Sequence, residues 1–336
     1  MFGINILGTG SYLPKLKVDN EMMSKIVETN DEWISTRTGI STRHLVDGET
    51  TWYMGAMASK QAIECADINP IDIGLIIDTT ITNDFSTPSA ACLIQNEIGA
   101  LNAAAFDLNA ACSGFIYAMD TAKRFLQTDE SLKYVLIVAN EMLSSITNYE
   151  DRSTCILFGD GAAAFIIERS EKFYTSYLSA DGSGGKYLYA KNKHRKHPFY
   201  NSDGSAKDFT NELMKDYNVD SYELVQDGRA VYKFATSALP TATQKAAQKA
   251  NIDVDEIDWF IPHQANIRII ETAAKNIGVS MDKFIVNLNE IGNTSSVTIP
   301  LAFDEAVKDG RIKRGDKCCL VGFGAGLTMG CIIIDY

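Results

Sequence analysis

The sequence has little of what disulfide-stapled or metal-bound domains depend on. Its seven cysteines include no CxxC pair, and no Cys/His cluster has the spacing of zinc ligands, so neither a disulfide framework nor a structural zinc is expected. Only seven prolines occur among 336 residues, of which 46% are hydrophobic and 22% are charged. This composition excludes collagen-like and disordered chains and is typical of a globular protein.

Basic charge is also scarce. Lys and Arg number 31 against 43 Asp and Glu, which gives a net charge of −12 and does not suit a nucleic-acid-binding protein. Residues 1–6 lack the basic start and long apolar stretch of a secretory signal, and no apolar run reaches 18 residues. We therefore expect a reduced, cytoplasmic protein without a membrane segment or a nucleic-acid partner, and the length predicts about two domains or two halves.

Short apolar runs of the kind that form buried strands alternate with helical patterns along the chain. The clearest runs lie at 75–77, 105–108, 135–138, 163–167, 259–261, 318–321 and 331–334. This alternation predicts an α/β fold with buried strands.

The chain also repeats itself at a constant offset of 184. Residues 66–77 match 250–261, and each segment is preceded by a helical stretch and followed by a second helix, which ends at Gly99 or Gly278. A further pair joins 133–138 to 317–321, each followed by a glycine-rich turn. Short apolar segments can match by chance, but three matches in the same order favour two similar halves. We expect these halves to span 1–172 and 173–336.

A basic insertion near 181–210 breaks this rhythm. Residues 186–197 hold five Lys or Arg and no acid. Such a lid-like run is either a solvated loop or a docking site for an anionic ligand or partner, and the sequence leaves both interpretations open.

Cys112 is the cysteine best placed for chemistry. An expected strand at 104–108 meets Ser113 and Gly114, which open a helical pattern. The positive end of a helix dipole favours a thiolate, and therefore a nucleophile. The alternative is a buried structural cysteine, which is the commoner fate of this residue type and the one we expect for the other six.

Three further segments hold candidate functional groups. His263 follows an expected strand at 259–262, and strand ends are where ligands collect in α/β proteins. Asn293 lies in a loop that enters a helix, where a capping role is the simpler interpretation. The turn at 322–326 is either an oxyanion-binding backbone or a plain hairpin. Gly8-Thr9-Gly10 resembles a dinucleotide-binding motif, but position 13 is Leu, so no such cofactor is expected.

Several motifs in one order resemble the β-ketoacyl-acyl carrier protein synthase III family of the thiolase superfamily. They are GTGSYLP at 8–14, DEWI through RTGI at 31–40, AACSGF at 110–115, FGDG at 158–161, PHQAN through Arg268 at 262–268, and GNTS at 292–295. The resemblance covers nearly the whole chain. It implies a duplicated five-layer α-β-α-β-α sandwich, and this duplication agrees with the internal repeat. Members of the superfamily are usually homodimers.

The resemblance implies a catalytic triad of Cys112, His263 and Asn293. Cys112 would take an acyl group from acyl-CoA, and malonyl carrier protein would then lose CO2 and attack it. A neutral, donating His263 and Asn293 would stabilise the enolate. The backbone N–H groups of Cys112 and Ala325 would hold the acyl-transfer oxyanion, although the family often has glycine at the second position. No cofactor is implied, because acyl-CoA is a substrate.

The resemblance also assigns residues to substrate and partner binding. Contacts to CoA would come from Trp33, Arg37, Thr29, Arg152 and Asn266, with Trp33 and Arg152 stacking on the adenine. The acidic carrier protein would dock on Lys233, Arg268 and Lys275. Thr87 matches an acyl-pocket position where some family members carry Phe, so it would leave room for primers larger than acetyl.

The expected reaction is therefore a decarboxylative condensation that starts fatty-acid synthesis. A synthase-III-like acyltransferase or ketosynthase of a secondary-metabolite pathway is one alternative, and a Cys-His thioester hydrolase is another. A binding protein without catalysis is a third. Asn293 counts against simple acyl transfer, which needs no enolate, and the complete triad counts against an idle protein. Fold does not fix substrate, so the primer and the carrier protein stay open.

Overall fold

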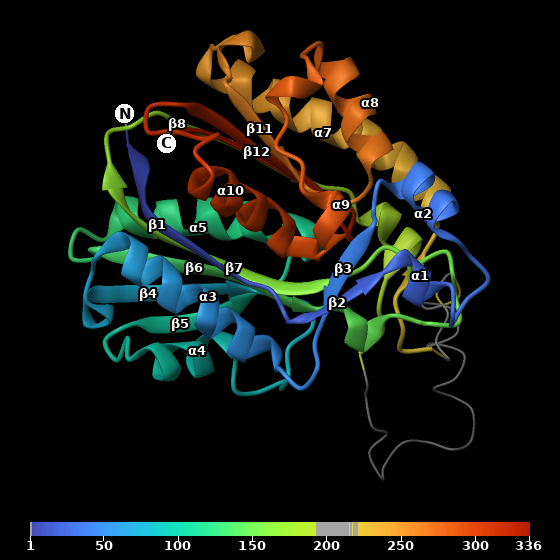
Figure 1. The fold of residues 1–336 in the computed structure, drawn as a ribbon. Helices are drawn as coiled ribbons and strands as arrows, with labels where there is room; N and C mark the ends of the chain where they lie inside the picture. The colour runs from blue at the N-terminus through green and yellow to red at the C-terminus, as the bar shows by residue number, and fades with distance from the viewer. Residues whose placement is uncertain (1, 193–214, 216, 218–220) are drawn as a thin grey trace.

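Two mixed β-sheets form the framework of the protein, shown by a computed structural model that describes residues 2–192, 215, 217 and 221–336 (Figure 1). The first sheet has the order β1-β7-β6-β4-β5, and the second has the order β11-β12-β13-β8. The strands are β1 (Gly3–Tyr12), β4 (Ile73–Thr79), β5 (Ala104–Leu108), β6 (Tyr134–Met142), β7 (Asp160–Ser170), β8 (Tyr174–Ala180), β11 (Trp259–Pro262), β12 (Lys317–Gly324) and β13 (Thr328–Asp335).

Helices separate and cover the two sheets, which gives five layers (Figure 1). α3 (Thr51–Ala66) and α4 (Ala90–Ile98) cover the outer face of the first sheet, and α7 (Gly228–Ala250) and α8 (Ile267–Ile277) cover that of the second. α5 (Gly114–Thr128) and α10 (Thr298–Lys308) lie between the sheets. The predicted α-β-α-β-α sandwich is confirmed.

Smaller elements surround this framework. They are β2 (Leu16–Asp19), α1 (Asn20–Met23), α2 (Asp31–Thr38), β3 (Thr42–Leu45), β9 (Leu188–Tyr189), β10 (Val225–Gln226) and α9 (Leu288–Ile291), with short 3-10 turns that include η2 (Ala111–Ser113) and η7 (Ser295–Val297). Within the described ranges, no helix combines the length and apolar character needed to cross a membrane.

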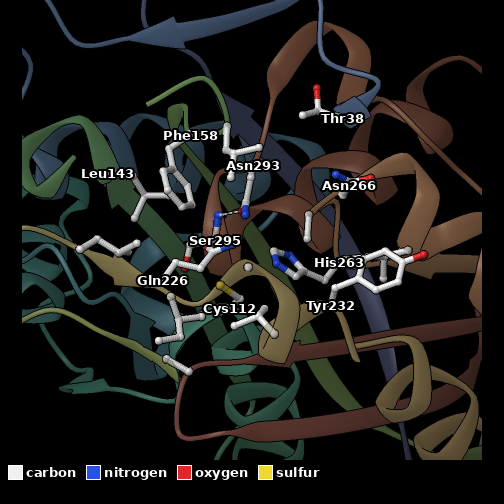
Figure 2. A pocket seen from close by; sticks show the side chains of 18 of the residues that line it. Thr38, Cys112, Leu143, Phe158, Gln226, Tyr232, His263, Asn266, Asn293 and Ser295 are labelled. Atoms are coloured by element: carbon white, nitrogen blue, oxygen red, sulfur yellow. Dashed lines mark hydrogen bonds between the residues drawn. The ribbon is translucent and has the colours of Figure 1, made fainter. Parts of the chain in front are cut away.

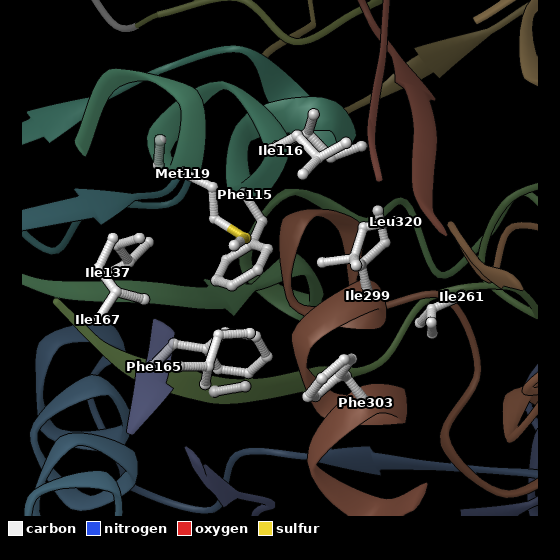
Figure 3. Close-up of a cluster of buried hydrophobic side chains, with 14 of the residues drawn as sticks. Phe115, Ile116, Met119, Ile137, Phe165, Ile167, Ile261, Ile299, Phe303 and Leu320 are labelled. Carbon is white, nitrogen blue, oxygen red and sulfur yellow. The ribbon is translucent and has the colours of Figure 1, made fainter. Parts of the chain in front are cut away.

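The middle layer is apolar because it is covered on both sides. Phe115 of α5 packs edge-on against Phe165 of β7, with ring centroids 4.9 Å apart, and Phe165 lies 5.1 Å from Phe303 of α10 (Figure 3). All three side chains are buried. Burying a Phe side chain stabilises the fold by about 1.5–3 kcal/mol, so this cluster joins the two sheets through both central helices.

The internal repeat of the sequence corresponds to repeated structure. α3 ends at Ala66 and α7 at Ala250, and each is capped by a short polar residue in the left-handed region, Asp67 (φ 50°) and Asn251 (φ 55°). A 3-10 turn and a parallel strand, β4 or β11, follow in both cases. Asp and Asn tolerate this conformation better than other non-glycine residues. The predicted division at 172/173 falls between β7 and β8, which belong to different sheets.

The basic insertion is described only at its two ends. β9 and β10 pair as antiparallel strands and bring Leu188 next to Gln226. Residues 193–210 of the predicted insertion, and with them part of the basic run 186–197, lie outside the described residues.

Candidate active site

A cavity of about 260 Å³ contains the three side chains of the expected triad. Cys112, His263 and Asn293 come from separate segments and face this common space (Figure 2). Most of the other lining groups near them are apolar, including Leu143, Phe158, Leu188, Leu224 and Phe323. An apolar cavity with a few converging polar groups is the usual form of a small-molecule site.

Cys112 sits in the turn η2, directly before α5. Ala111 adopts a left-handed conformation (φ 47°), and the Asn109 side chain accepts its amide proton at 3.2 Å. Burial raises the pKa of Cys112 to about 12, while the neighbouring Ser295 side chain acts in the opposite direction. Burial therefore opposes the thiolate that the helix dipole is expected to favour. The thiolate must form during attack.

The turn after β12 passes close to the nucleophile. A Cβ atom at Gly324 would lie 2.7 Å from the amide nitrogen of Cys112 and 3.1 Å from that of Ser113, so only glycine fits this approach. Ala325, the next residue, lines the cavity together with Cys112. This arrangement brings the two backbone segments of the predicted oxyanion site together.

His263 is held on several sides at the end of β11. Its backbone N–H donates to the Val321 carbonyl at 2.9 Å, its Nδ1 lies 2.7 Å from Thr298 Oγ1, and Phe323 packs edge-on at 5.2 Å. Burial lowers the pKa of His263 to about 3. The imidazole is therefore neutral at physiological pH, as the apolar strand before it predicted.

Asn293 has its side-chain amide oriented by its own loop. Ser295 donates its backbone N–H to Asn293 Oδ1 at 2.9 Å. The Asn293 backbone N–H donates to the Leu157 carbonyl at 2.8 Å, and the Asn293 carbonyl accepts from Gly159 at 3.0 Å. Because the amide oxygen is engaged with the loop, the Nδ2 group is the part left to donate into the cavity.

The predicted CoA residues Trp33, Arg37 and Arg152 form one cluster. The guanidinium carbons of Arg37 and Arg152 lie 4.5 Å and 5.0 Å from the centre of the Trp33 ring. An adenine stacked between Trp33 and Arg152 needs about 7 Å, two van der Waals separations. The Arg152 side chain, which donates to the Glu28 carbonyl at 2.9 Å, must therefore move if adenine binds there.

Thr29 and Asn266 differ in the hydrogen-bonding groups that they leave available to a ligand. Thr29 Oγ1 is buried without a hydrogen-bond partner in the described structure, so it can receive a polar ligand. The Asn266 side chain caps α8 by accepting from the Arg268 backbone at 2.9 Å and donates to the Arg37 carbonyl at 3.0 Å. Asn266 also lines the cavity, but its amide already has two structural partners.

The remaining predicted residues lie outside the cavity. Lys233 of α7 and Arg268 and Lys275 of α8 are exposed, on two helices that also line the cavity through Val231 and Ile269. Thr87 is exposed and does not line the cavity of its own chain. Its assigned role in an acyl pocket stays a prediction.

Sequence reasoning missed Glu141, a buried acid at the end of β6. Its carboxylate accepts from Thr82 Oγ1 at 2.7 Å, the Ile81 backbone at 3.1 Å and Ser296 Oγ at 3.3 Å. Burial raises the pKa of Glu141 to about 7. The available signal was an acid three residues after the apolar run 135–138. The described residues contain no group of three or more His, Cys, Asp or Glu that could hold a metal ion.

Comparisons with known proteins decide the family. Two family models match, one described as 3-oxoacyl-[acyl-carrier-protein] synthase III at residues 106–196 and one as its C-terminal part at 247–336. A protein of Clostridium acetobutylicum named β-ketoacyl-[acyl-carrier-protein] synthase III is 46% identical over 338 residues, which cover all of this chain and 99% of that protein. The chain belongs to this family. It is therefore an enzyme, a condensing acyltransferase.

Solved structures of synthase III relatives share the fold. The 3-oxoacyl-[acyl-carrier-protein] synthase III of Aquifex aeolicus is 38% identical, with a TM-score of 0.88 over 99% of this chain and all of that one. The priming β-ketosynthase of the R1128 polyketide pathway is 33% identical, with a TM-score of 0.85 over 98% of this chain and 96% of that one. The first matched family region contains Cys112, and the second contains His263 and Asn293.

Proposed function

We propose that this synthase joins a short acyl-CoA to malonyl-acyl carrier protein, releases CO2 and forms 3-ketoacyl-acyl carrier protein, the first condensation of fatty-acid synthesis. One observation carries the proposal. A cysteine, a neutral histidine and an oriented asparagine amide face one apolar cavity, which is the set of groups that acyl transfer and decarboxylation need together.

The first half-reaction loads the enzyme. Cys112 Sγ attacks the thioester carbonyl, the bond from carbonyl carbon to CoA sulfur breaks, and the thiol proton leaves with CoA as CoA-SH. The tetrahedral oxyanion is held by the backbone N–H groups of Cys112 and Ala325. Trp33, Arg37, Arg152, Thr29 and Asn266 would hold the CoA moiety, with Arg152 moving away from Trp33 to admit the adenine.

The second half-reaction forms the new carbon–carbon bond. The malonyl carboxylate leaves as CO2, and its electron pair forms the enolate of the remaining thioester. His263 and Asn293 donate hydrogen bonds to the enolate oxygen, which stabilises the developing charge. The enolate carbon attacks the acyl carbonyl, the bond to Cys112 Sγ breaks, and the cysteine takes up a proton.

The carrier protein would approach over α7 and α8. Carrier proteins are acidic, and Lys233, Arg268 and Lys275 supply exposed positive charge there on a chain of net charge −12. Complementary charge steers such encounters and raises the association rate. All seven cysteines are free thiols, which fits a reducing compartment such as the cytoplasm.

The synthase would act as a homodimer through the free edge of β5. Among the described strands β5 pairs with β4 alone, and unpaired edges invite pairing with another chain. Exposed apolar side chains lie near this edge, namely Leu101 (65% exposed), Phe85 (53%) and Phe125 (43%). The loop that carries Thr87 is tied to β5, because Asp107 accepts from Asn83 and Ala90. Thr87 would therefore line the acyl pocket of the partner.

Product analysis by mass spectrometry tests the reaction. The synthase is incubated with malonyl-acyl carrier protein and acetyl-, isobutyryl- or longer acyl-CoA, beside Cys112→Ala. We expect 3-ketoacyl carrier protein and CO2 with the wild type and neither with the variant. Acylated Cys112 without a ketoacyl product would overturn the proposal, and free acid formed without carrier protein would indicate a hydrolase.

The primer is tested at Thr87. We expect branched or slightly longer acyl-CoA to be accepted and Thr87→Phe to lower the isobutyryl-to-acetyl rate ratio. An unchanged ratio would exclude Thr87 from the acyl pocket. The similarity to the R1128 priming ketosynthase makes priming of a polyketide pathway the second candidate function. Acceptance of only longer primers, or of another carrier protein, would favour it.

A further inference from the structure

The hydroxyl of Thr298 lies behind the catalytic histidine. Thr298 is the first residue of α10 and is buried, and its Oγ1 is 2.7 Å from His263 Nδ1 and 3.0 Å from the Ser295 carbonyl oxygen. We propose that Thr298 donates its hydroxyl proton to Nδ1 and thereby fixes the histidine tautomer that carries its proton on Nε2. This inference rests on the proposed condensation and identifies a positioning residue for it.

The two distances favour this direction of donation. An N–H donor to oxygen typically gives a heavy-atom distance of 2.9–3.0 Å, and 2.7 Å lies at the short end of its range. The Thr298 hydroxyl oxygen lies closer to His263 Nδ1, at 2.7 Å, than to the Ser295 carbonyl oxygen, at 3.0 Å, so its proton is better placed toward the ring nitrogen.

The competing acceptor does not need the hydroxyl. The Ser295 carbonyl already accepts the backbone N–H of Thr298, which ends the turn η7. It stays hydrogen-bonded when the hydroxyl turns toward the histidine. Nδ1 depends on Thr298, because Thr298 is the partner that the described structure provides for it, and a buried ring nitrogen without a partner costs about 1–3 kcal/mol.

The chemistry requires the same tautomer. Burial keeps His263 neutral, so the ring has one proton to place on its two nitrogens. A proton on Nδ1 would leave a lone pair on the other nitrogen, which repels an enolate oxygen instead of stabilising it. A proton on Nε2 lets His263 donate alongside Asn293, whose amide oxygen is engaged by Ser295. Ser295 thus contacts both Asn293, through its backbone N–H, and Thr298, through its carbonyl oxygen.

The tautomer can be read directly by nitrogen-15 NMR of histidine-labelled synthase. The chain has only four histidines, and His263→Gln assigns the signal of interest. We expect a protonated Nε2 and an unprotonated Nδ1 at pH 7. A proton found on Nδ1 would overturn the proposal. This measurement needs no substrate, so it stands or falls separately from the proposed condensation.

Half-reaction rates supply the functional test. In Thr298→Val, which keeps the shape and removes the hydroxyl, we expect malonyl-carrier-protein decarboxylation to slow about tenfold while acylation of Cys112 stays within about twofold. Thr298→Ser restores the hydroxyl and should restore decarboxylation. An equal loss in both half-reactions, or no loss in either, would overturn the positioning role. If the valine variant does not fold, the serine variant supplies the test. A Thr298→Ser variant that folds but decarboxylates at least tenfold more slowly than the wild type would overturn the positioning role.

Discussion

The turn at 109–114 and the turn at 293–298 are the same structure used twice, 184 residues apart. In each, an asparagine side chain accepts the backbone N–H two residues on, Asn109 from Ala111 at 3.2 Å and Asn293 from Ser295 at 2.9 Å. The accepting positions share a left-handed conformation, with φ 47° at Ala111 and 55° at Ser295. A 3-10 turn and a central helix, α5 or α10, follow both.

The side chains on this shared backbone differ. Cys112 opens into the cavity, whereas its counterpart Ser296 is buried and donates to the Thr79 carbonyl and Glu141. Asn109 is exposed, whereas Asn293 lines the cavity. The same strained turn therefore occurs twice, and each copy supplies a different group of the proposed triad. Such backbone strain is typical of functional sites.

The largest expected effect is the difference in condensation activity between substitution of Cys112 and substitution of Ser296. Cys112→Ala should lower condensation by roughly 10⁴-fold or more, since it removes the nucleophile. Ser296→Ala should keep activity within about threefold and lower the free energy of unfolding by about 1 kcal/mol, because it removes one buried hydrogen-bonding hydroxyl. Acyl-enzyme mass and denaturant unfolding measure the two effects. Equal loss of activity in both variants would show that Ser296 is also part of the chemistry.

Substitution of Asn293 and of Asn109 should impair different half-reactions. Asn293→Ala removes an enolate donor and should slow malonyl decarboxylation about 10²–10³-fold. Asn109→Ala removes only a turn hydrogen bond next to Cys112, so it should slow acylation by less than tenfold and spare decarboxylation. CO2 release and acyl-enzyme formation, measured separately, check this pattern. A large decarboxylation defect in Asn109→Ala would contradict it.

Gly114 and Thr298 begin the two central helices, but only the second position has room for a side chain. A Cβ atom at Gly114 would collide with the Thr79 hydroxyl. Gly114→Ala should therefore lower the free energy of unfolding by about 2 kcal/mol, as overpacking usually does. Adding Thr79→Ala should recover at least half of the loss in urea unfolding. No recovery would place the strain elsewhere.

The smallest expected effect concerns Glu141, which links β6 to the second turn. Its folded-state pKa of about 7 lies above the ordinary 4.5, so the folded protein holds this proton at pH values where the unfolded chain has lost it. Stability is therefore lost as pH rises through 7. Between pH 6.5 and 8 the wild type should lose about 1 kcal/mol more than Glu141→Gln. Parallel pH profiles in the two proteins would contradict the raised pKa.

Some of these results followed from local sequence patterns. The apolar runs predicted strands of both sheets; β6 and β7 are almost wholly buried, whereas the edge strand β5 is only half-buried. Glycine at 99 and 278 predicted the ends of α4 and α8, where each residue adopts a positive φ (75° and 92°). These signals are local, since a buried strand and a helix end each depend on a few neighbouring residues.

Other features depended on packing between distant segments. The burial that raises the pKa of Cys112 was not predicted, because the helix that follows this residue is visible in the sequence while its burial is not. Thr298 and Glu141 went unnoticed for the same reason, since their partners lie 35 residues from Thr298 and up to 155 residues from Glu141.

The sequence by itself determined the α/β class, the two similar halves and the identity of Cys112, His263 and Asn293 as candidates, because periodicity and motifs are properties of neighbouring residues. The tertiary structure alone decided how these groups are poised. It brought three separate segments around one cavity, lowered the pKa of the histidine and raised that of the cysteine by burial, and placed Thr298 behind the ring. Desolvation and hydrogen-bond direction depend on which surfaces meet, and that is set only when the chain has folded.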